Sequence, residues 1–572
     1  MKKWKRLLGL ALCLCAAVCV MSVSASAAAE HSHPICGKTH TGIGDHTGTC
    51  NDVTWTEVTQ AKVTDANGLT LEDGNSYYLG EDIKVKYDIT IKGTVNLCLN
   101  GHSITKTSES GTFEGVITVT PTATAGSSFT LCDCNGSGAG NGNITHANGV
   151  TGRGVLVSSS DSKQASFIMY GGTISGNHVG TDILPEDGAG VRVHNASFKM
   201  YGGTITNNHV EKMSNCGGGG VAAHNSAKFI MYGGEISRNT SNGDGGGVGV
   251  VGASFEMHGG EINGNNAASG GGVCLWNDSF TLSGGTISGN TAKDDGGGVY
   301  FSGSDNGDTL TISDTVEISG NSAANGGGVY IRSQDLAVTG NIINNNVTGS
   351  GGGVYFKGDT FNVSGNVSIT GNKNTGSGLT DADNNVYLPA GKTIIVGGAL
   401  TGSKIGVTTE NTPSDSNYVP IASGTTSNTD PDKFLYENDG TAVSAVVGRY
   451  TTMLVACKHN WSGEWTTDTD QHWKECSICK GKNDVSAHNY DKEVAEESYK
   501  ASDATCTSPA LYYKSCVCGP RARIPLDAAI KTPTTTAARW AIGSPMKTIT
   551  GKSIPAAMSP QTRHLITGTP VL

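Results

Sequence analysis

The chain has 572 residues, of which 16% are charged and 6% are aromatic, with 82 glycines and a formal net charge of −11. The acidic balance argues against nucleic acid and anionic membrane surfaces as partners, because both carry negative charge themselves. The low charge and the abundance of Gly, Ser, Thr and Asn favour one elongated repeat domain with appendages over several globular domains.

The first 27 residues have the pattern of a secretory signal peptide. Four basic residues precede an apolar run that ends at Val23, and Ala25-Ser26-Ala27 forms a small-residue cleavage site. We therefore expect a secreted chain, extracellular or associated with a cell surface. The apolar run is short for a membrane span and small residues follow it, so we expect no transmembrane segment.

A His/Cys-rich arm follows the signal peptide, and three interpretations of it stay open. It contains Cys36 and Cys50 among four histidines. Cysteine with flanking imidazole suits a metal site, a disulfide is equally natural outside the cell, and an unstructured arm is the third alternative. No spacing in this segment decides between them.

Two early strands each end in a cysteine. The stretch Val95-Asn-Leu-Cys98 aligns with Phe129-Thr-Leu-Cys132. Stacked strands would place the two Cα atoms about 4.8 Å apart, which is inside the range that a disulfide spans. We predict a disulfide between Cys98 and Cys132, both facing outward.

Residues 279–301, SFTLSGGTISGNTAKDDGGGVYF, recur with variations along residues 153–400. Each copy holds three short stretches in which apolar and polar residues alternate, separated by Gly, Asn and Asp. The valine that opens the third stretch recurs at intervals of 25 to 36 residues from Val155 onward. Alternation with period two predicts strands with one inward face. Copies this short leave no room for crossover helices, so we predict a parallel β-helix whose coils stack on one another.

An asparagine lies three residues after the isoleucine of every copy. Asparagine tolerates left-handed turn conformations, and its amide can bond the equivalent amide of the next coil. We predict a buried structural ladder made of Asn177, Asn208, Asn239, Asn265, Asn290, Asn321, Asn345 and Asn372.

The motifs GGTISGN, SFTLSGG and GGGVYF resemble the right-handed parallel β-helix (pectin-lyase-like) repeats of surface proteins from gut Gram-positive bacteria, and they are similar to the repeats of polymorphic adhesin passengers. The resemblance covers about residues 75–400 and implies an all-β, right-handed parallel β-helix of about 11 to 12 coils. It leaves the function open, because lyases, hydrolases, tailspikes and adhesins share this fold.

The resemblance also says what an enzyme of this fold would need. Its lyases use acidic calcium ligands with an Arg or Lys base, and its hydrolases use paired aspartates with Gly-His-Gly and Arg-x-Lys. Here the only close acidic pair in the repeats, Asp294-Asp295, precedes a glycine cluster and is interpreted as a turn. We therefore predict no catalytic residues and a protein that is not an enzyme.

Outward positions of the predicted coils carry a row of aromatic residues. The position after the leading valine is tyrosine in four successive copies, and a tryptophan lies beside the start of this row. Aromatic rows suit a linear glycan or a partner surface, whereas tyrosines also stack on each other to stabilise a sheet. The residues predicted for ligand contact are Tyr300, Tyr330, Tyr355, Tyr387 and Trp276.

A Cys/His/Trp module follows a predicted cap and linker. It looks like the short Cys/His/Trp tail repeats that accompany β-helices in Gram-positive surface proteins. A C-x-x-C knuckle with histidines at moderate distance predicts zinc held by His459, Cys476, Cys479 and His488. Disulfides are the competing interpretation in a secreted chain. Apart from this zinc we expect no cofactor.

The tail departs from everything before it, with seven Lys/Arg against one acidic residue in residues 520–572. We interpret it as a disordered end or a shifted reading frame. The predicted divisions are a signal peptide (1–27), the His/Cys arm (28–55), an N-terminal cap with the first coils (56–152), regular repeats (153–400), a C-terminal cap and linker (401–456), the Cys/His/Trp module (457–519) and the basic tail (520–572).

Together these features predict a secreted or cell-surface, adhesin-like monomer that binds glycans or neighbouring surfaces through shallow repeated contacts. The alternatives are a polysaccharide lyase or glycoside hydrolase with an atypical site, and a passive rod in the cell wall.

Overall fold

The computed structural model describes most of the chain between residues 55 and 488. The gaps in this range are residues 65–67, 109–114, 123, 134–141, 160–162, 182–187, 212–213, 278, 304–306, 377–381, 426, 439–442, 448–450 and 469. Five short strands outside the range are described as well: β1 (His31–His33), β2 (Lys38–His40), β53 (Lys500–Ser502), β54 (Leu511–Tyr513) and β55 (Ala529–Lys531). The predicted signal peptide, Cys36, Cys50 and nearly all of the predicted basic tail lie outside the described residues.

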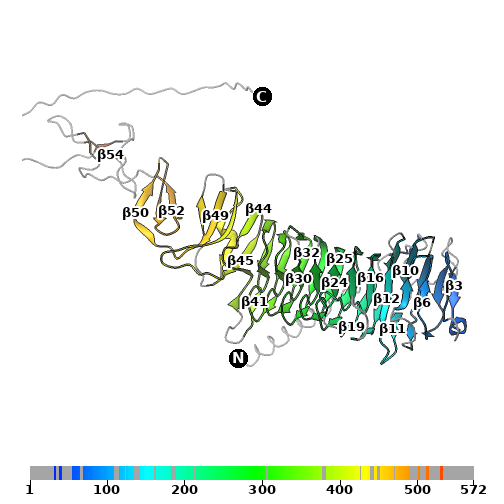
Figure 1. The fold of residues 1–572 in the computed structure, drawn as a ribbon. Helices are drawn as coiled ribbons and strands as arrows, with labels where there is room; N and C mark the ends of the chain where they lie inside the picture. The colour runs from blue at the N-terminus through cyan, green and yellow to red at the C-terminus, as the bar shows by residue number, and fades with distance from the viewer. Residues whose placement is uncertain are drawn as a thin grey trace, which may run out of the picture. The chain divides into compact units, whose positions relative to one another are not determined.

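The body of the chain is a parallel β-solenoid, which confirms the predicted all-β, parallel β-helix class. Strands of successive coils lie over one another along its axis (Figure 1). Pairing is in register, so Val299, Val329 and Val354 lie opposite one another in consecutive coils. The first line of stacked strands comprises β6 (Ile89–Ile91), β9 (Gly115–Val119), β12 (Arg153–Ser158), β16 (Val191–His194), β20 (Val221–His224), β24 (Val248–Val251), β27 (Val273–Trp276), β30 (Val299–Ser302), β34 (Val329–Ile331), β38 (Val354–Phe356) and β43 (Val386–Leu388).

Two further lines complete the large sheet. The second contains β3 (Trp55–Val58), β4 (Ser76–Leu79), β7 (Thr94–Cys98), β10 (Ser127–Cys132), β13 (Ala165–Met169), β17 (Ser197–Met200), β21 (Lys228–Met231), β25 (Ser254–Asn263), β28 (Phe280–Ser288), β31 (Thr309–Ile312), β35 (Asp335–Val338), β39 (Phe361–Gly365), β44 (Ile394–Leu400) and β46 (Val419–Thr425). The third contains β5 (Ile83–Val85), β8 (Ile104–Lys106), β11 (Asn143–His146), β14 (Thr173–Ser175), β18 (Thr204–Thr206), β22 (Glu235–Ser237), the ends of β25 and β28, β32 (Val316–Ser319), β36 (Asn341–Ile343), β40 (Ser368–Thr370), β45 (Lys404–Thr409) and β47 (Phe434–Tyr436).

A fourth line of two-residue strands, which the sequence did not predict, closes each coil after the asparagine. It forms a separate sheet that is parallel except at its last pair. Two residues are too few to show the alternation by which a strand is recognised in a sequence. The strands are β15 (His178–Val179), β19 (His209–Val210), β23 (Thr240–Ser241), β26 (Asn266–Ala267), β29 (Thr291–Ala292), β33 (Ser322–Ala323), β37 (Asn346–Val347), β41 (Lys373–Asn374) and β42 (Ala382–Asp383).

The interior of the solenoid consists of columns of like side chains. Consecutive phenylalanine rings from Phe129 to Phe255 stack with centroids 4.7 to 5.4 Å apart. The isoleucines that precede the asparagines form a second fully buried column, for example Ile262, Ile287 and Ile318. A single coil could not remove these side chains from water on both its open faces, so burial depends on stacking.

The eight asparagines are buried and bonded into one continuous ladder. Each side-chain amide donates from Nδ2 to Oδ1 of the next asparagine at 2.9 or 3.0 Å along the run from Asn177 to Asn372. The same Oδ1 also accepts the backbone N–H of the preceding asparagine, as Asn290 does from Asn265. The side-chain nitrogen and oxygen of each of these amides therefore have hydrogen-bond partners, which offsets the free-energy cost of burying them.

Both ends of the ladder finish on a titratable group. Nδ1 of His146 lies 2.8 Å from Oδ1 of Asn177 at one end. At the other end Asn372 donates to Asn385 at 2.6 Å, and Asn385 donates to the carboxylate of Glu437. The ladder thus contains nine asparagines, since Asn385 extends the predicted eight.

The parallel stack ends in antiparallel strands. Strand β46 pairs with β49 (Thr451–Ala456), which pairs in turn with β48 (Val443–Val447). The last edge of the second line of strands is thereby covered. A three-stranded sheet follows: β50 (Trp461–Thr467), β51 (Gln471–Cys476) and β52 (Lys482–Ala487).

The chain divides into two compact units. The first comprises Met1–Trp465 with Trp473–Val485, and the second comprises Thr466–His472 with Ser486–Leu572. In the second unit β54 pairs antiparallel with β53 and β55. The described helices are two short 3-10 turns, η1 (Gln60–Lys62) and η2 (Pro431–Lys433). Among the described residues no helix has the length and apolar character needed to span a membrane.

Candidate functional site

The four tyrosines predicted for ligand contact form a stack on the first line of strands. Tyr300, Tyr330, Tyr355 and Tyr387 lie in register, with ring centroids 5.5, 5.0 and 4.8 Å apart. The first two rings are buried, at 7% and 6% exposed, whereas Tyr355 and Tyr387 are half-buried. We call these four residues the tyrosine stack. Its accessible part is the end at Tyr355 and Tyr387.

A disulfide that the sequence did not predict covers the other end of the tyrosine stack. Cys274 lies opposite Tyr300, and its sulfur is bonded to Cys216, 58 residues earlier. Trp276, the fifth predicted contact residue, packs against the same cluster. Since these groups cover Tyr300, this end of the stack serves packing.

Charged side chains line the middle of the tyrosine stack. The Lys357 ammonium lies 5.1 Å from the ring centroid of Tyr355 and 6.0 Å from that of Tyr330. Oδ1 of Asp295 accepts the amide of Asn325 at 3.1 Å. Burial raises the pKa of Asp295, although Asn325 and Lys357 oppose this shift. Burial and the nearby Asp295 charge raise the pKa of Tyr330 in turn.

Asp295 is thus more than the turn residue that the sequence indicated. Its neighbour on the next coil is Asn325, which occupies the same position before the glycine cluster of its own copy of the repeat. Asp244, two coils earlier, also has a raised pKa, first through burial and further through Asp294 and Asp295. Asp244 and Asp295 are therefore two partly buried carboxyl groups at equivalent turn positions, and Asp295 is the one beside the tyrosine stack.

A pocket of about 560 Å³ lies at the accessible end of the tyrosine stack. Its wall begins at Leu388, directly after Tyr387, and continues through the turn after β43 and the segments around Glu410 and Tyr418. The Glu410 carboxylate accepts the backbone N–H of Ala390 at 2.8 Å. The pKa of Tyr387 is raised by burial, by Tyr355 and by Glu410, which places this carboxylate within electrostatic reach of the stack.

Polar residues dominate the rest of the pocket wall. We call this pocket the cap pocket. The polar residues include Lys392, Asn411, Ser414 and Asn417. The sequence placed residues 388–393 of this wall in the last repeat and residues 409–420 in a cap and linker, which lacks the repeat from which a site could be recognised. The pocket forms only where the last coils and the cap come together.

A second aromatic row lies on a different corner of the coils. Tyr170, Tyr201, Tyr232 and His258 stack with centroids 4.8, 4.8 and 5.1 Å apart. Tyr201 and Tyr232 are each 41% exposed. Their faces cover one another, so only their edges and hydroxyl groups face solvent. This row offers a matched control for the tyrosine stack.

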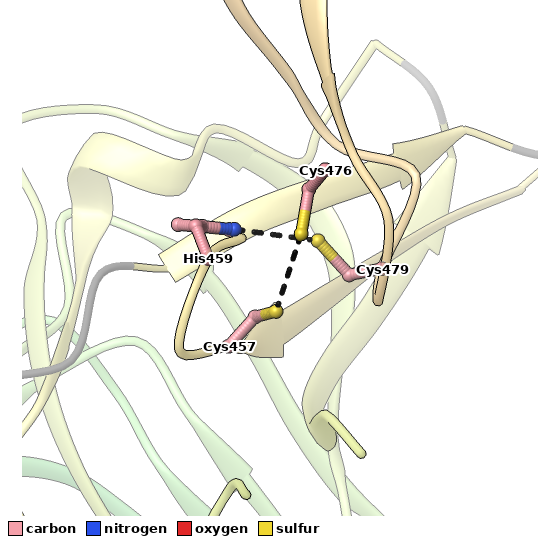
Figure 2. Close-up of side chains that lie close together, drawn as sticks. All are labelled: Cys457, His459, Cys476 and Cys479. Carbon is pink, nitrogen blue, oxygen red and sulfur yellow. Dashed lines mark hydrogen bonds between the residues drawn. The ribbon is translucent and has the colours of Figure 1, made fainter. Parts of the chain in front are cut away.

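A compact cluster of three cysteines and a histidine lies beyond the cap strands (Figure 2). Its members are Cys457, His459, Cys476 and Cys479, and their ligand atoms all lie within 4.8 Å of one another. Sγ of Cys457 is 3.8 Å from Sγ of Cys476, and Sγ of Cys479 is 3.5 Å from Nδ1 of His459. All three cysteines are buried thiols. The donor set suits a tetrahedral metal ion.

Ionisation is favoured at one of these sulfurs. Burial opposes the thiolate of Cys476, but hydrogen bonds from the backbone of Cys479, from His459 and from the backbone of Ile478 lower its pKa to about 6. Burial and the two other thiols raise the pKa of Cys457.

One member of the predicted ligand set is replaced. Three of the four predicted residues meet, but His488 does not join them and Cys457 takes its place. In the chain, the six-residue strand β52 lies between Cys479 and His488, and an extended strand of that length carries the chain about 20 Å onward. Nε2 of His488 instead lies 3.1 Å from the carbonyl oxygen of Asp468. The motif Cys457-Lys-His459, which directly follows a strand, was the signal that could have identified the fourth member of the cluster.

Cys98 and Cys132 lie opposite each other in register on β7 and β10. Both are present as thiols, so the disulfide between them stays a prediction. The two are outward of the core but covered, because Trp55, Tyr78 and Tyr170 pack around them.

Comparison of the chain with protein-family models, with curated proteins and with solved structures finds no match. The fold itself defines the class, which is a parallel β-solenoid.

Proposed function

We propose that this chain is an extracellular binding protein that holds a glycan along the accessible end of the tyrosine stack and in the cap pocket. The observation that carries the proposal is a pocket of about 560 Å³ whose wall includes Leu388, the residue after half-buried Tyr387, and Glu410, whose charge acts on Tyr387. This volume falls within the range of sites that hold small ligands, about 300 to 1,000 Å³.

The chemistry of the wall favours a saccharide. Sugar rings present C–H faces that pack on aromatic rings and hydroxyl groups that need donors and acceptors. Tyr418 in the wall offers the first kind of contact, and Tyr387, which precedes the wall residue Leu388, extends it outside the pocket. Asn411, Asn417 and Glu410 in the wall supply the second kind. A long solenoid flank also lets a linear chain make several shallow contacts at once.

Location outside the cell is supported by the signal-peptide pattern of residues 1–27, and an adhesin-like role is supported by the resemblance of the repeats to surface proteins.

Binding rather than hydrolysis is supported by the carboxylates that line the cap pocket. Glycoside hydrolysis commonly uses two carboxylates about 5 to 10 Å apart. Among the described residues that line the cap pocket, Glu410 is the single carboxylate.

One observation favours a second candidate, a polysaccharide hydrolase or lyase acting at the tyrosine stack. Partly buried Asp244 and Asp295 have raised pKa values, and Lys357 and Arg332 lie within electrostatic reach of Asp295. Carboxyl groups with a raised pKa are the kind that protonate a glycosidic oxygen in glycosidases.

The test uses the purified mature chain on an array of bacterial and mucin glycans, followed by calorimetry on any glycan that binds. Tyr387→Ala and Glu410→Gln are expected to weaken binding at least tenfold, because the first removes the aromatic ring next to the pocket and the second removes the carboxylate of the pocket wall. The matched control, Tyr232→Ala, removes an equally stacked tyrosine from the second row and is expected to bind like the wild type.

The outcomes separate the candidates. Equal loss of binding in Tyr232→Ala, or no glycan bound by the wild type, would overturn the proposed site. Release of shortened glycan by the wild type but not by Asp295→Asn would instead establish the enzyme.

A further inference from the structure

We infer that Cys457, His459, Cys476 and Cys479 bind one zinc ion, which fastens the β51–β52 hairpin to the last strands of the solenoid cap. The ligands come from two places in the chain. Cys457 follows directly after the cap strand β49, and His459 lies two residues later. Cys476 ends β51, and Cys479 lies in the turn before β52.

The spacing of the donor atoms is that of a tetrahedral zinc site. With Zn–S bonds of about 2.3 Å and Zn–N bonds of about 2.0 Å, tetrahedral angles place two sulfurs about 3.8 Å apart and a sulfur and a nitrogen about 3.5 Å apart. The observed separations are 3.8 Å for Cys457 and Cys476 and 3.5 Å for Cys479 and His459. The four side chains converge on one point in Figure 2.

Groups around the ligands hold them for a metal. Nε2 of His459 lies 2.9 Å from Oγ of Ser444 on β48, which leaves Nδ1 directed at the cluster. The backbone N–H groups of Ile478 and Gly481 donate to the sulfurs of Cys476 and Cys479, each at 3.4 Å. Such outer contacts orient the imidazole and stabilise thiolates, as they do at metal sites generally.

Disulfide formation cannot satisfy this cluster. It contains three cysteines, so one disulfide would leave the third sulfur buried beside a histidine with no covalent partner. A metal ion uses all four donors at once. Thiolates with an imidazole in a tetrahedral, closed arrangement select zinc over the harder divalent cations.

The ion would join elements that otherwise meet through few apolar contacts. The hairpin contributes Cys476, Cys479 and the half-buried Ile478 to the cluster, and the cap contributes Val455 and Cys457. Folding of so small a module depends on the metal when its core is this limited.

The test measures the metal in the full mature chain purified under reducing conditions without chelator. We expect one zinc per chain by elemental analysis. Replacing zinc with cobalt should give the intense visible absorption of a tetrahedral site together with thiolate-to-cobalt charge transfer. Cys457→Ser should lower the zinc content to near zero, whereas His488→Ala should keep one zinc per chain, which discriminates between the two ligand sets.

Two further variants guard against simple misfolding. His459→Cys should keep zinc and strengthen the thiolate charge-transfer band of the cobalt form. Ser444→Ala should keep the stoichiometry but weaken zinc affinity about tenfold, because the imidazole loses its outer contact. Wild-type chain that is folded and reduced but carries no zinc, or a Cys457–Cys476 disulfide found by non-reducing peptide mapping, would overturn the inference.

Discussion

Asn385 donates its backbone N–H to the Glu437 carboxylate at 2.9 Å, and its side-chain amide donates to the other oxygen of the same carboxylate. This pair ends the asparagine ladder. Every amide from Asn177 to Asn372 donates one N–H toward this end and the other to an isoleucine carbonyl of the preceding coil. The last amide therefore needs an acceptor, and a carboxylate is the strongest available. At the opposite end the first Oδ1 needs a donor, and His146 lies there.

Glu437→Ala is expected to destabilise the C-terminal coils by about 3 kcal/mol, because both donors of Asn385 lose a charged acceptor in a buried site. Chemical denaturation followed by circular dichroism measures the loss. Glu261→Gln, which changes an exposed carboxylate of a middle coil, is the control and should stay within about 0.5 kcal/mol of the wild type. Equal stability of the two variants would show that the ladder needs no terminal acceptor.

His146 predicts a pH dependence at the other end of the ladder. Burial lowers its pKa to about 4, although the hydrogen bond with Asn177 opposes the shift. Nε2 is buried without a hydrogen-bond partner, which fits a neutral ring. Because the unfolded chain takes up this proton near pH 6.5 and the folded chain only near pH 4, stability is fully present above 6.5 and falls as the pH drops toward 4. The loss is about 3 kcal/mol.

The measurement compares wild type with His146→Asn in thermal melts between pH 7 and pH 4. The side-chain nitrogen of asparagine is bonded to Cγ, as Nδ1 is in histidine. It can therefore still donate a hydrogen bond to Asn177, and the amide does not titrate in this pH range. The variant is expected to lose less stability than the wild type over this range. Parallel pH profiles would contradict the assignment.

Gly249 makes room for the Cys216–Cys274 disulfide. A Cβ at this position would lie 2.1 Å from the carbonyl oxygen of Cys216. Gly249→Ala is therefore expected to push Cys216 away and leave two thiols that react with maleimide. Loss of a cross-link across 58 residues should cost about 4 kcal/mol. Gly397→Ala, where a Cβ meets nothing within 4 Å, is the matched control; an intact disulfide in Gly249→Ala would refute the steric argument.

Asn290 tests the interior of the ladder. Its Nδ2 donates to Oδ1 of Asn321 at 3.0 Å and to the carbonyl of Ile262 at 2.9 Å. Asn290→Asp would place a carboxylate oxygen against these two acceptors, and we expect a loss of about 3 kcal/mol or more. Hydrogen exchange of the coils on either side reports the effect. The exposed Asn366→Asp should leave exchange unchanged, and similar exchange in both variants would contradict the ladder's role.

The sequence by itself determined the solenoid. Residues such as Ile287 and Asn290 recur in a fixed order, so their neighbours in the next coil are their own equivalents, and the period is enough to predict what stacks on what. Burial follows from the same alternation, since a side chain two residues from an inward one also faces inward. Fold class and the makeup of the columns could therefore be predicted without coordinates.

Only the tertiary structure decided which unlike residues meet. Cys216 reaches Cys274 across an intervening coil, Cys457 and not His488 completes the Cys/His cluster, and the cap forms a pocket after the last residue of the tyrosine stack. These contacts join turns and appendages that have no period. The positions of the residues in these contacts depend on loop lengths and on the space left by a missing side chain, as at Gly249. The repeat pattern determines neither of them.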